Sequence, residues 1–215
     1  ECIELLKEAD IVVTNPPFSL FREYVAQLIE YDKKFLIIGN VNAISYKEIF
    51  PLIMNNKIWL GASIHSGDRK FWVPNDYELN AAGCGIDETG RKYIRVKGVR
   101  WFTNLDYNER HENIILYKRY IPEVYPKYIN YDAINVDKTE EIPMDYDGAM
   151  GVPITFLDKY NPEQFEILGK SLDLADMSVI KQRLGKLNGG PRFYIEKDGI
   201  LIRLYERIVI RKIKK

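Results

Sequence analysis

Four consecutive residues, Asn15-Pro16-Pro17-Phe18, have the clearest chemical potential in the chain. The two prolines fix the backbone and lack amide donors, so their carbonyls can point outward. Asn15 carries one acceptor and two N–H donors on a short side chain, and Phe18 offers a flat apolar ring. The Asn15 oxygen and the Pro16 carbonyl can each accept one hydrogen from an exocyclic amine. The motif therefore predicts a catalytic site that orients and polarises an amino group on a planar ring.

The residues around this motif predict the elements that position it. Ile11–Thr14 is a β-branched run, predicted to be a fully buried strand that stops at Asn15. Ser19 is predicted to cap a helix that runs to about Tyr31, and Phe35–Ile38 is predicted to be a second buried strand. Ligands of open α/β sheets bind at the carboxyl ends of strands, so the motif lies where a site is expected.

The alternation of strands and helices continues to residue 60 and then stops. Ser45 is predicted to cap a helix to about Met54, and Ile58–Leu60 is predicted to be a third strand. Strands alternating with helices predict parallel strands with covering helices, an α/β core. After residue 60 the segments are strand-like with no long helix between them. Gly98–Leu105 and Asn113–Tyr117 are predicted to form an antiparallel hairpin.

The last third of the chain has a different composition. Residues 121–150 are rich in Pro, Tyr, Asp and Asn, which indicates irregular structure. Near the C-terminus, Lys197-Asp198-Gly199 predicts the turn of a β-hairpin. We therefore expect two regions, 1–120 with the motif and 121–215 as a mixed C-terminal region.

Charge is distributed unevenly along the chain. The totals are 31 basic and 31 acidic residues, which excludes a uniformly basic nucleic-acid binder. Residues 121–180 contain 4 basic and 12 acidic residues, net −8, whereas residues 181–215 contain 11 basic and 3 acidic ones, net +8. A separate cluster contains five basic residues and no acidic one: Arg91, Lys92, Arg95, Lys97 and Arg100. Because screened potentials are local, this cluster predicts contact with phosphates such as those of a nucleic acid; a solvated strand face is the alternative.

The segment Asp10–Phe18 resembles motif IV of the amino-methyltransferases that use S-adenosylmethionine. The run through Ser19–Tyr24, and later segments at 35–39, 42–46, 98–105 and 151–157, resemble the EcoRI-type adenine-specific DNA methyltransferase family. The resemblance is discontinuous but covers most of the chain. It implies a partial Rossmann-like methyltransferase fold with antiparallel hairpin strands and a mixed C-terminal region.

The resemblance also implies an activity: methyl transfer from S-adenosylmethionine to adenine N6 in double-stranded DNA, of the restriction-modification type. The adenine would be flipped out of the duplex, because N6 cannot be reached while the base is stacked. By motif position, Asn15 and the Pro16 carbonyl would bind N6, Pro17 would hold the loop, and Phe18 would stack on the base. Region 1–120 would be part of the catalytic domain, and region 121–215 would hold a DNA-recognition element.

One family feature does not occur in this sequence. The glycine-rich cofactor motif that the family places upstream of motif IV is not among the 14 residues before Asn15, which contain no glycine. We therefore expect an N-terminally truncated chain without the main cofactor pocket, inactive by itself.

Two alternatives remain open from the residues alone. Motif IV also occurs in amino-methyltransferases that act on RNA or on protein glutamine, so the substrate could belong to either class. The chain could instead be a DNA-binding or assembly module that keeps the motif without catalysing.

The composition limits other kinds of site. His65 and His111 have no neighbouring ligand residues, so we expect no metal site. Cys2 and Cys84 lie far apart, which excludes a disulfide framework and suits a reducing cytoplasm. No apolar run approaches the roughly 20 residues that span a bilayer, so we expect no membrane partner.

Overall fold

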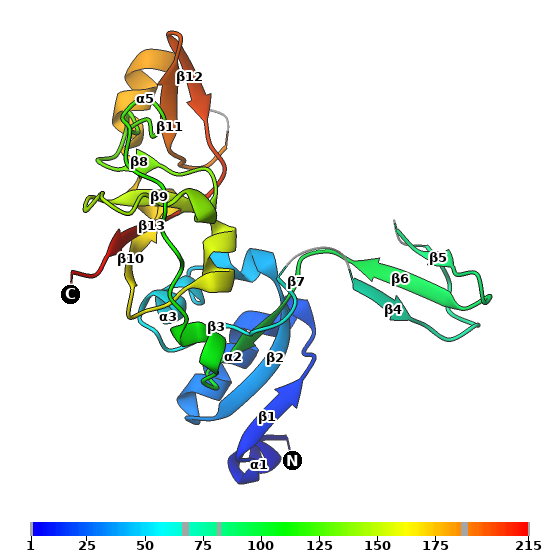
Figure 1. Ribbon diagram of the computed structural model, residues 1–215. Helices are drawn as coiled ribbons and strands as arrows, with labels where there is room; N and C mark the ends of the chain where they lie inside the picture. Colours follow the sequence, from blue (N-terminus) through cyan, green and yellow to red (C-terminus); the bar gives the residue numbers. More distant parts are fainter. Residues whose placement is uncertain (1, 66–68, 81–82, 186–188, 215) are drawn as a thin grey trace. The chain divides into compact units, whose positions relative to one another are not determined.

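The structure is a computed structural model that describes residues 2–65, 69–80, 83–185 and 189–214 (Figure 1). The chain divides into two compact units, Glu1–Asp106 and Tyr107–Lys215, which are described separately below. The segment 107–120 therefore belongs to the second compact unit, whereas the sequence-based division into functional regions lies at residue 120.

The first unit is built on a four-stranded mixed sheet with the order β1-β2-β7-β3 (Figure 1). Its strands are β1 (Ile11–Thr14), β2 (Lys34–Asn40), β7 (Val99–Thr103) and β3 (Trp59–Leu60). β1 and β2 are parallel, and β7 is antiparallel to both β2 and β3. The α/β character predicted from the sequence is confirmed. The sheet itself is mixed, because β7 lies between two strands that run in the same direction.

The helices of this unit are short. They are α1 (Cys2–Glu8), η1 (Phe18–Leu20), α2 (Phe21–Glu30), η2 (Val41–Ser45) and α3 (Phe50–Met54). α2 begins at Phe21, and Ser19 lies inside the preceding 3₁₀ turn rather than capping the helix. Ser45 ends η2 and is followed by a turn before α3, so neither serine caps the predicted helix.

Close packing of α2 on the sheet depends on Gly39 of β2. Alternate residues of β2 are buried, including Phe35 and Ile37. The rings of Phe21 and Phe102 meet edge to face with centroids 4.9 Å apart. A Cβ atom at Gly39 would lie 2.5 Å from the Phe21 ring and 2.8 Å from the Phe102 ring, so only glycine leaves room for both.

β1 departs from the prediction of a fully buried strand. The side chains of Ile11 and Val13 are 52% and 65% exposed. In the described part of the chain β1 pairs with β2 alone, so it is an edge strand with one uncovered face. An apolar run predicts a strand, but what covers it depends on other segments.

The predicted hairpin between Gly98–Leu105 and Asn113–Tyr117 is wrong. Val99–Thr103 forms β7, which pairs with β2 and β3, and residues 113–117 contain no strand. Local sequence suggested a neighbouring partner, whereas β7 fills the central position between two earlier strands.

A second, three-stranded antiparallel sheet belongs to the first unit, with the order β4-β6-β5 (Figure 1). Its strands are β4 (Arg69–Trp72), β5 (Gly85–Ile86) and β6 (Lys92–Val96). β6 is connected to β7 by a tight turn at Lys97 and Gly98, so the same chain segment serves both sheets.

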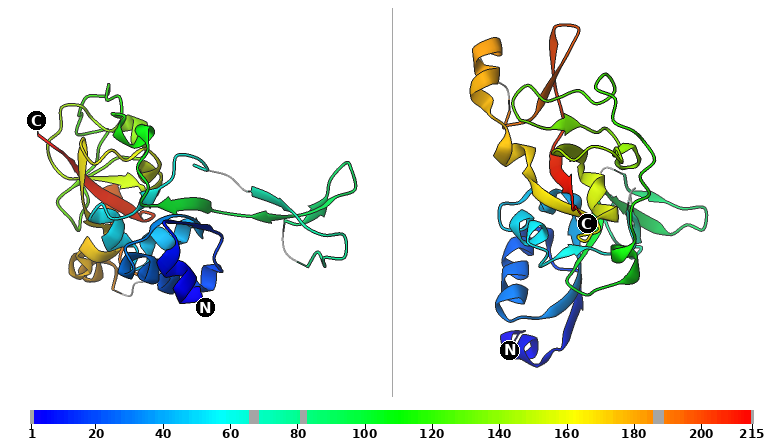
Figure 2. Two further views of the ribbon diagram at one scale, coloured as in Figure 1. Left: turned by 90° about the horizontal axis from the view of Figure 1, so that it is seen from below. Right: turned by 60° about the vertical axis from the view of Figure 1, so that its left-hand side comes forward.

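The second unit contains a sheet with the order β10-β13-β9-β8 and a separate hairpin, β11–β12 (Figure 1). The hairpin is the orange-red pair of strands in the right-hand view of Figure 2. Its strands are β8 (Ile134–Asn135), β9 (Met150–Pro153), β10 (Phe165–Lys170), β11 (Tyr194–Lys197), β12 (Ile200–Arg203) and β13 (Arg207–Lys212). Its helices are η3 (Asn108–His111), η4 (Thr139–Glu141), η5 (Ile154–Lys159), α4 (Ser171–Leu174) and α5 (Met177–Leu184). The predicted C-terminal hairpin is confirmed: Asp198 and Gly199 both have positive φ, 52° and 75°, as a two-residue hairpin turn requires.

A buried polar network holds the sheet of the second unit together. The Tyr128 hydroxyl lies 3.0 Å from Asn135 Oδ1 and 3.1 Å from the Gly151 carbonyl oxygen. Arg207 Nε donates to the same Asn135 oxygen, and its guanidinium forms an ion pair with Asp137 at 3.0 Å. Burial raises the pKa of Tyr128 far above its ordinary value, so this hydroxyl stays neutral and acts as a structural group.

Candidate active site

The motif Asn15–Phe18 follows β1 directly, at the carboxyl end of the parallel pair β1–β2. Pro16 is buried, Phe18 is half-buried at the start of η1, and Asn15 is exposed. The buried proline anchors the loop, and the asparagine beside it remains accessible. The placement is the one that the sequence predicted for a site.

Hydrogen bonds around the motif leave two acceptors without a partner. The Pro17 carbonyl accepts from Leu20 N at 2.9 Å, and the Phe18 carbonyl accepts from Phe21 N, which together form the turn η1. Among the described residues, neither the Asn15 side chain nor the Pro16 carbonyl has a hydrogen-bond partner. These are the two groups that the sequence analysis assigned to an incoming amino group.

The motif borders a pocket of about 520 Å³. Its lining residues come from the motif, β2, β4, β6 and β7: Asn15, Pro16, Pro17, Phe18, Ile38, Phe71, Ile94, Val96 and Val99. Of these lining residues Asn15 alone is polar. An apolar pocket with one amide and one free carbonyl at its rim suits a planar ring that bears a single amino group.

Two walls of the pocket come from β4 and β6, which were not predicted to lie near the motif. Phe71 and Ile94 are directly opposite each other in the antiparallel pair, as are Arg69 and Val96. Residues opposite each other share a face, so Arg69 lies on the pocket-lining face. Its Nε is buried and has no hydrogen-bond partner among the described residues. The alternation of apolar and basic residues in these strands is the signal that could have revealed this face.

Asn40, at the end of β2, positions the turn between β6 and β7. Its Nδ2 donates to the Lys97 carbonyl at 3.1 Å, and its Oδ1 accepts from Asn42 N at 2.9 Å. Val41 N donates to the Gly98 carbonyl at 2.6 Å, and Gly98 adopts φ +66°. These bonds attach the strands that wall the pocket to the carboxyl end of β2.

The structure separates the five basic residues predicted to bind DNA. Arg91, Arg95 and Lys97 are exposed, whereas Lys92 is half-buried and its Nζ donates to the Tyr77 carbonyl at 2.9 Å. Arg100 is only 6% exposed, and its guanidinium donates to the carbonyls of His65 and Val99. Three of the five side chains are therefore accessible to a phosphate. Arg100 is buried and binds backbone carbonyls instead.

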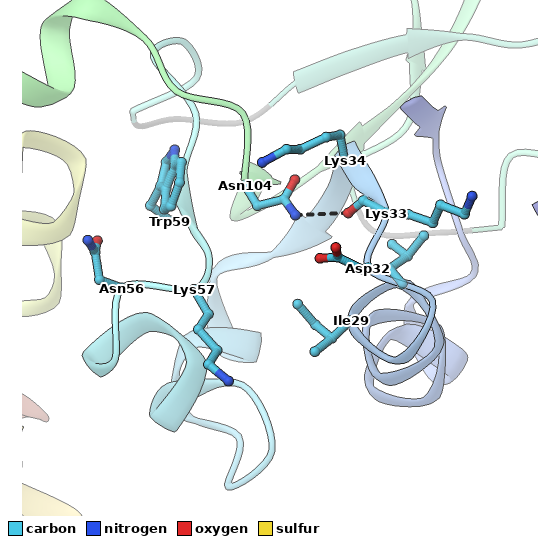
Figure 3. Close-up of a pocket in the computed structure, with 9 residues that line it drawn as sticks. Ile29, Asp32, Lys33, Lys34, Asn56, Lys57, Trp59 and Asn104 are labelled. Atoms are coloured by element: carbon cyan, nitrogen blue, oxygen red, sulfur yellow. Dashed lines mark hydrogen bonds between the residues drawn. The ribbon is translucent and has the colours of Figure 1, made fainter. Parts of the chain in front are cut away.

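A second pocket, of about 390 Å³, lies at the amino end of the parallel strands and contains Asn104, Trp59 and Lys34 (Figure 3). Asn104 Nδ2 donates to the Lys33 carbonyl at 2.8 Å (Figure 3). Asn104 Oδ1 accepts from Phe35 N at 2.9 Å. The side-chain amide thereby continues the ladder between β2 and β7 by one step. We assign this pocket a structural role.

An Asn104→Ala variant is expected to lose about 1–3 kcal/mol of unfolding free energy, because two hydrogen bonds disappear and the Phe35 amide loses its acceptor. Asn104→Asp keeps that acceptor and should lose less. All three tryptophans lie in the first unit, so urea unfolding followed by tryptophan fluorescence measures the effect. Asn55→Ala, which removes one exposed bond to the Pro51 carbonyl, is the control. Equal stability of the two alanine variants would contradict the structural role.

The described residues contain no cluster of His, Cys, Asp or Glu that could hold a metal ion. S-adenosylmethionine carries an ammonium, a carboxylate and ribose hydroxyls, all of which need polar partners. The pocket beside the motif offers one polar side chain, so it fits the amine that receives a methyl group and does not fit this cofactor. No described helix is long and apolar enough to cross a membrane.

Comparison with known proteins finds a matching family and several related sequences. The family model described as "Adenine-specific methyltransferase EcoRI" matches residues 1–213. The type II methyltransferase M.EcoRI of Escherichia coli is 57% identical over 183 residues, which cover 83% of this chain and 56% of that protein. The type II methyltransferase M.MgeORF184P of Mycoplasma genitalium is 40% identical over 219 residues, covering 99% of this chain and 67% of that protein. No solved structure matches significantly.

The family match over residues 1–213 identifies the chain as a member of a methyltransferase family. The chain belongs to the EcoRI-type adenine-specific methyltransferase family, as the resemblance of its motifs implied. A third relative, M.MpnI of Mycoplasma pneumoniae, is 42% identical over 172 residues, covering 78% of this chain and 54% of that protein. The chain thus spans between half and two thirds of the length of these relatives.

Proposed function

We propose that this chain forms the base-binding part of a methyltransferase that modifies adenine N6 in double-stranded DNA, as one half of a restriction-modification system. The observation that carries the proposal is the pocket at Asn15–Phe18, where the Asn15 side chain and the Pro16 carbonyl have no hydrogen-bond partner among the described residues and lie beside an apolar cavity. Family membership supports the reaction class, and the relatives' names as type II methyltransferases support the biological role.

In this proposal the adenine leaves the stack and enters the pocket, since N6 is inaccessible inside a duplex. The Asn15 oxygen and the Pro16 carbonyl each accept one N6 hydrogen. These bonds turn the N6 lone pair out of conjugation with the ring. The lone pair can then point toward the methyl group that it attacks. Phe18 lies on the base and fixes its rotation. S-adenosylmethionine, when bound, supplies an electrophilic methyl carbon on a sulfonium.

Catalysis by these residues rests on positioning and polarisation rather than on a strong base. The described pocket contains no titratable side chain. Holding the amine in one orientation converts a diffusive encounter into an aligned one, which is the larger part of the expected rate gain. The apolar walls exclude water and strengthen both hydrogen bonds to N6.

The finer fold assignment is also a proposal. The β1–α2–β2 unit, two parallel strands joined by a helix, supports a partial Rossmann-like methyltransferase fold. We further propose that region 1–120 belongs to the catalytic domain, that region 121–215 contributes to DNA recognition, and that the protein acts in the cytoplasm.

One assay can separate three substrate classes and three outcomes. The protein in its full natural length is incubated with S-adenosylmethionine carrying a labelled methyl group and with duplex DNA, RNA or protein. We expect label in DNA, recovered as N6-methyladenine after digestion to nucleosides. Label in RNA or in glutamine alone would replace the DNA proposal, and absence of transfer to all three would favour a non-catalytic DNA-binding module.

A further inference from the structure

The face of the β4–β6 pair that points away from the motif pocket has an unusual composition. Lys70 lies opposite Arg95 and Trp72 lies opposite Tyr93, and residues opposite each other in an antiparallel pair share a face. Lys70 and Arg95 are exposed, and Trp72 is 46% exposed. This face therefore presents an accessible indole ring among basic side chains.

The aromatic rings on this face hold cations. Lys70 Nζ lies 4.6 Å from the centroid of the Tyr93 ring, and Arg91 Cζ lies 4.6 Å from the centroid of the Trp72 ring. The two rings meet edge to face, with centroids 5.8 Å apart and planes at 86°. Each of the two cations therefore makes a cation–π contact with a ring, and the two rings pack against each other.

Among the described residues, no carboxylate forms a salt bridge with Lys70, Arg91 or Arg95. The Asp87 carboxylate, close to Arg91, is engaged in its own turn: its Oδ1 accepts from Arg91 N at 2.8 Å and from Thr89 N at 2.9 Å. These bonds, with a smaller contribution from the Arg91 charge, hold the pKa of Asp87 below its ordinary value.

We propose that this surface, the basic–aromatic face of Lys70, Trp72, Arg91, Tyr93 and Arg95, binds phosphates of the DNA duplex while the opposite face of the same strands walls the adenine pocket. The inference rests on the proposed function and deepens it by naming the DNA-contacting surface. Charge complementarity identifies the partner: cations on and beside a strand pair, with no salt bridge to a described carboxylate, fit a polyanion.

The rings have a defined part in this arrangement. Lysine and arginine side chains lose much rotational freedom when they bind a phosphate. Tyr93 and Trp72 hold two of the cations in place before DNA arrives, so less freedom is lost on binding. Trp72 is thus a positioning residue for Arg91.

Binding of the full-length natural protein to a fluorescent duplex, measured by anisotropy between about 50 and 200 mM salt, tests the phosphate contacts. Lys70→Ala and Arg91→Ala should each reduce the slope of log K against log salt by about 0.9, the value for one phosphate. Arg91→Lys should retain the slope. Lys34→Ala, which removes an exposed lysine at the start of β2 in the other sheet of the first unit, should leave both affinity and slope unchanged.

The role of Trp72 requires a double-variant cycle. Trp72→Leu should weaken DNA binding, and the loss on Arg91→Ala should be smaller in that background than in the wild type, because the cation has already lost its support. If the fold losses of DNA affinity in the two single variants simply multiply in the double variant, Trp72 has no positioning role for Arg91.

These experiments distinguish failure of this inference from failure of the proposed function. A wild type that methylates DNA, with variants Lys70→Ala and Arg91→Ala that keep the full salt slope, overturns this inference and leaves the proposed function standing. A wild type that neither binds nor methylates DNA overturns both. Thermal unfolding of each variant confirms that its exposed substitution leaves the fold intact.

Discussion

An Asn15→Ala variant is expected to lose methyl transfer by about 10²–10³-fold in kcat, the usual cost of removing one hydrogen-bonding group aimed at a reacting atom. The variant deletes one of the two acceptors for the amino group, so the base enters the pocket with its N6 lone pair still conjugated. Asn15 is exposed and has no described hydrogen-bond partner, so its removal should not destabilise the fold.

Single-turnover methyl transfer by the protein in its full natural length separates this effect from binding. Affinity for duplex DNA should stay within about threefold of the wild type, because one neutral amide contributes little to phosphate contacts. Asn15→Asp keeps an acceptor and should retain more activity than the alanine variant. Asn55→Ala, an exposed asparagine outside the pocket, should behave as wild type. Undiminished transfer by Asn15→Ala would remove Asn15 from the catalytic site.

A Gly151→Ala substitution is expected to destabilise the second unit by about 2–4 kcal/mol, through overpacking and through lost hydrogen bonds. A Cβ atom at Gly151 would collide with the hydroxyl of Tyr128 and would lie 2.8 Å from its ring carbons. Tyr128 cannot simply move aside, because its ring stacks on Phe193 at a centroid distance of 4.4 Å. Displacing its hydroxyl also leaves Asn135 without one partner.

The Tyr128→Phe background tests the cause. Removing the hydroxyl removes the worst collision, so Gly151→Ala should cost less in that background than in the wild type. Tryptophan fluorescence does not report on this unit, so hydrogen exchange at the amides of β9 and β13 is the suitable measurement. Gly190→Ala, whose Cβ would meet only Leu172 at 3.5 Å, is the control. Equal costs in both backgrounds would show that the Tyr128 hydroxyl is not the obstacle.

The two faces of β6 connect the chemical and the binding proposals. Ile94 and Val96 wall the motif pocket, and the alternating residues Tyr93 and Arg95 belong to the basic–aromatic face. β6 would thus bind phosphate with one face and border the base pocket with the other. Movement of this strand on DNA binding would therefore change the shape of the pocket.

Local sequence determined the features that depend on neighbouring residues. A strand that ends at Asn15 and a rigid turn at Pro16-Pro17 follow from the chain itself, as does the hairpin turn at Asp198-Gly199. The accessibility of the Asn15 amide follows from this local geometry. Helix starts were less certain, because Ser19 and Ser45 became part of 3₁₀ turns instead of caps.

Only the tertiary structure decided which distant segments meet. β7 pairs with β2 and β3 rather than with its neighbour in sequence, and this pairing buries Arg100 while Arg95 stays exposed. The pocket exists because residues 71–99 come to lie against a motif at residues 15–18. Periodicity tells which residues of a strand share a face, but the partner of that face is set by packing between segments far apart in the chain.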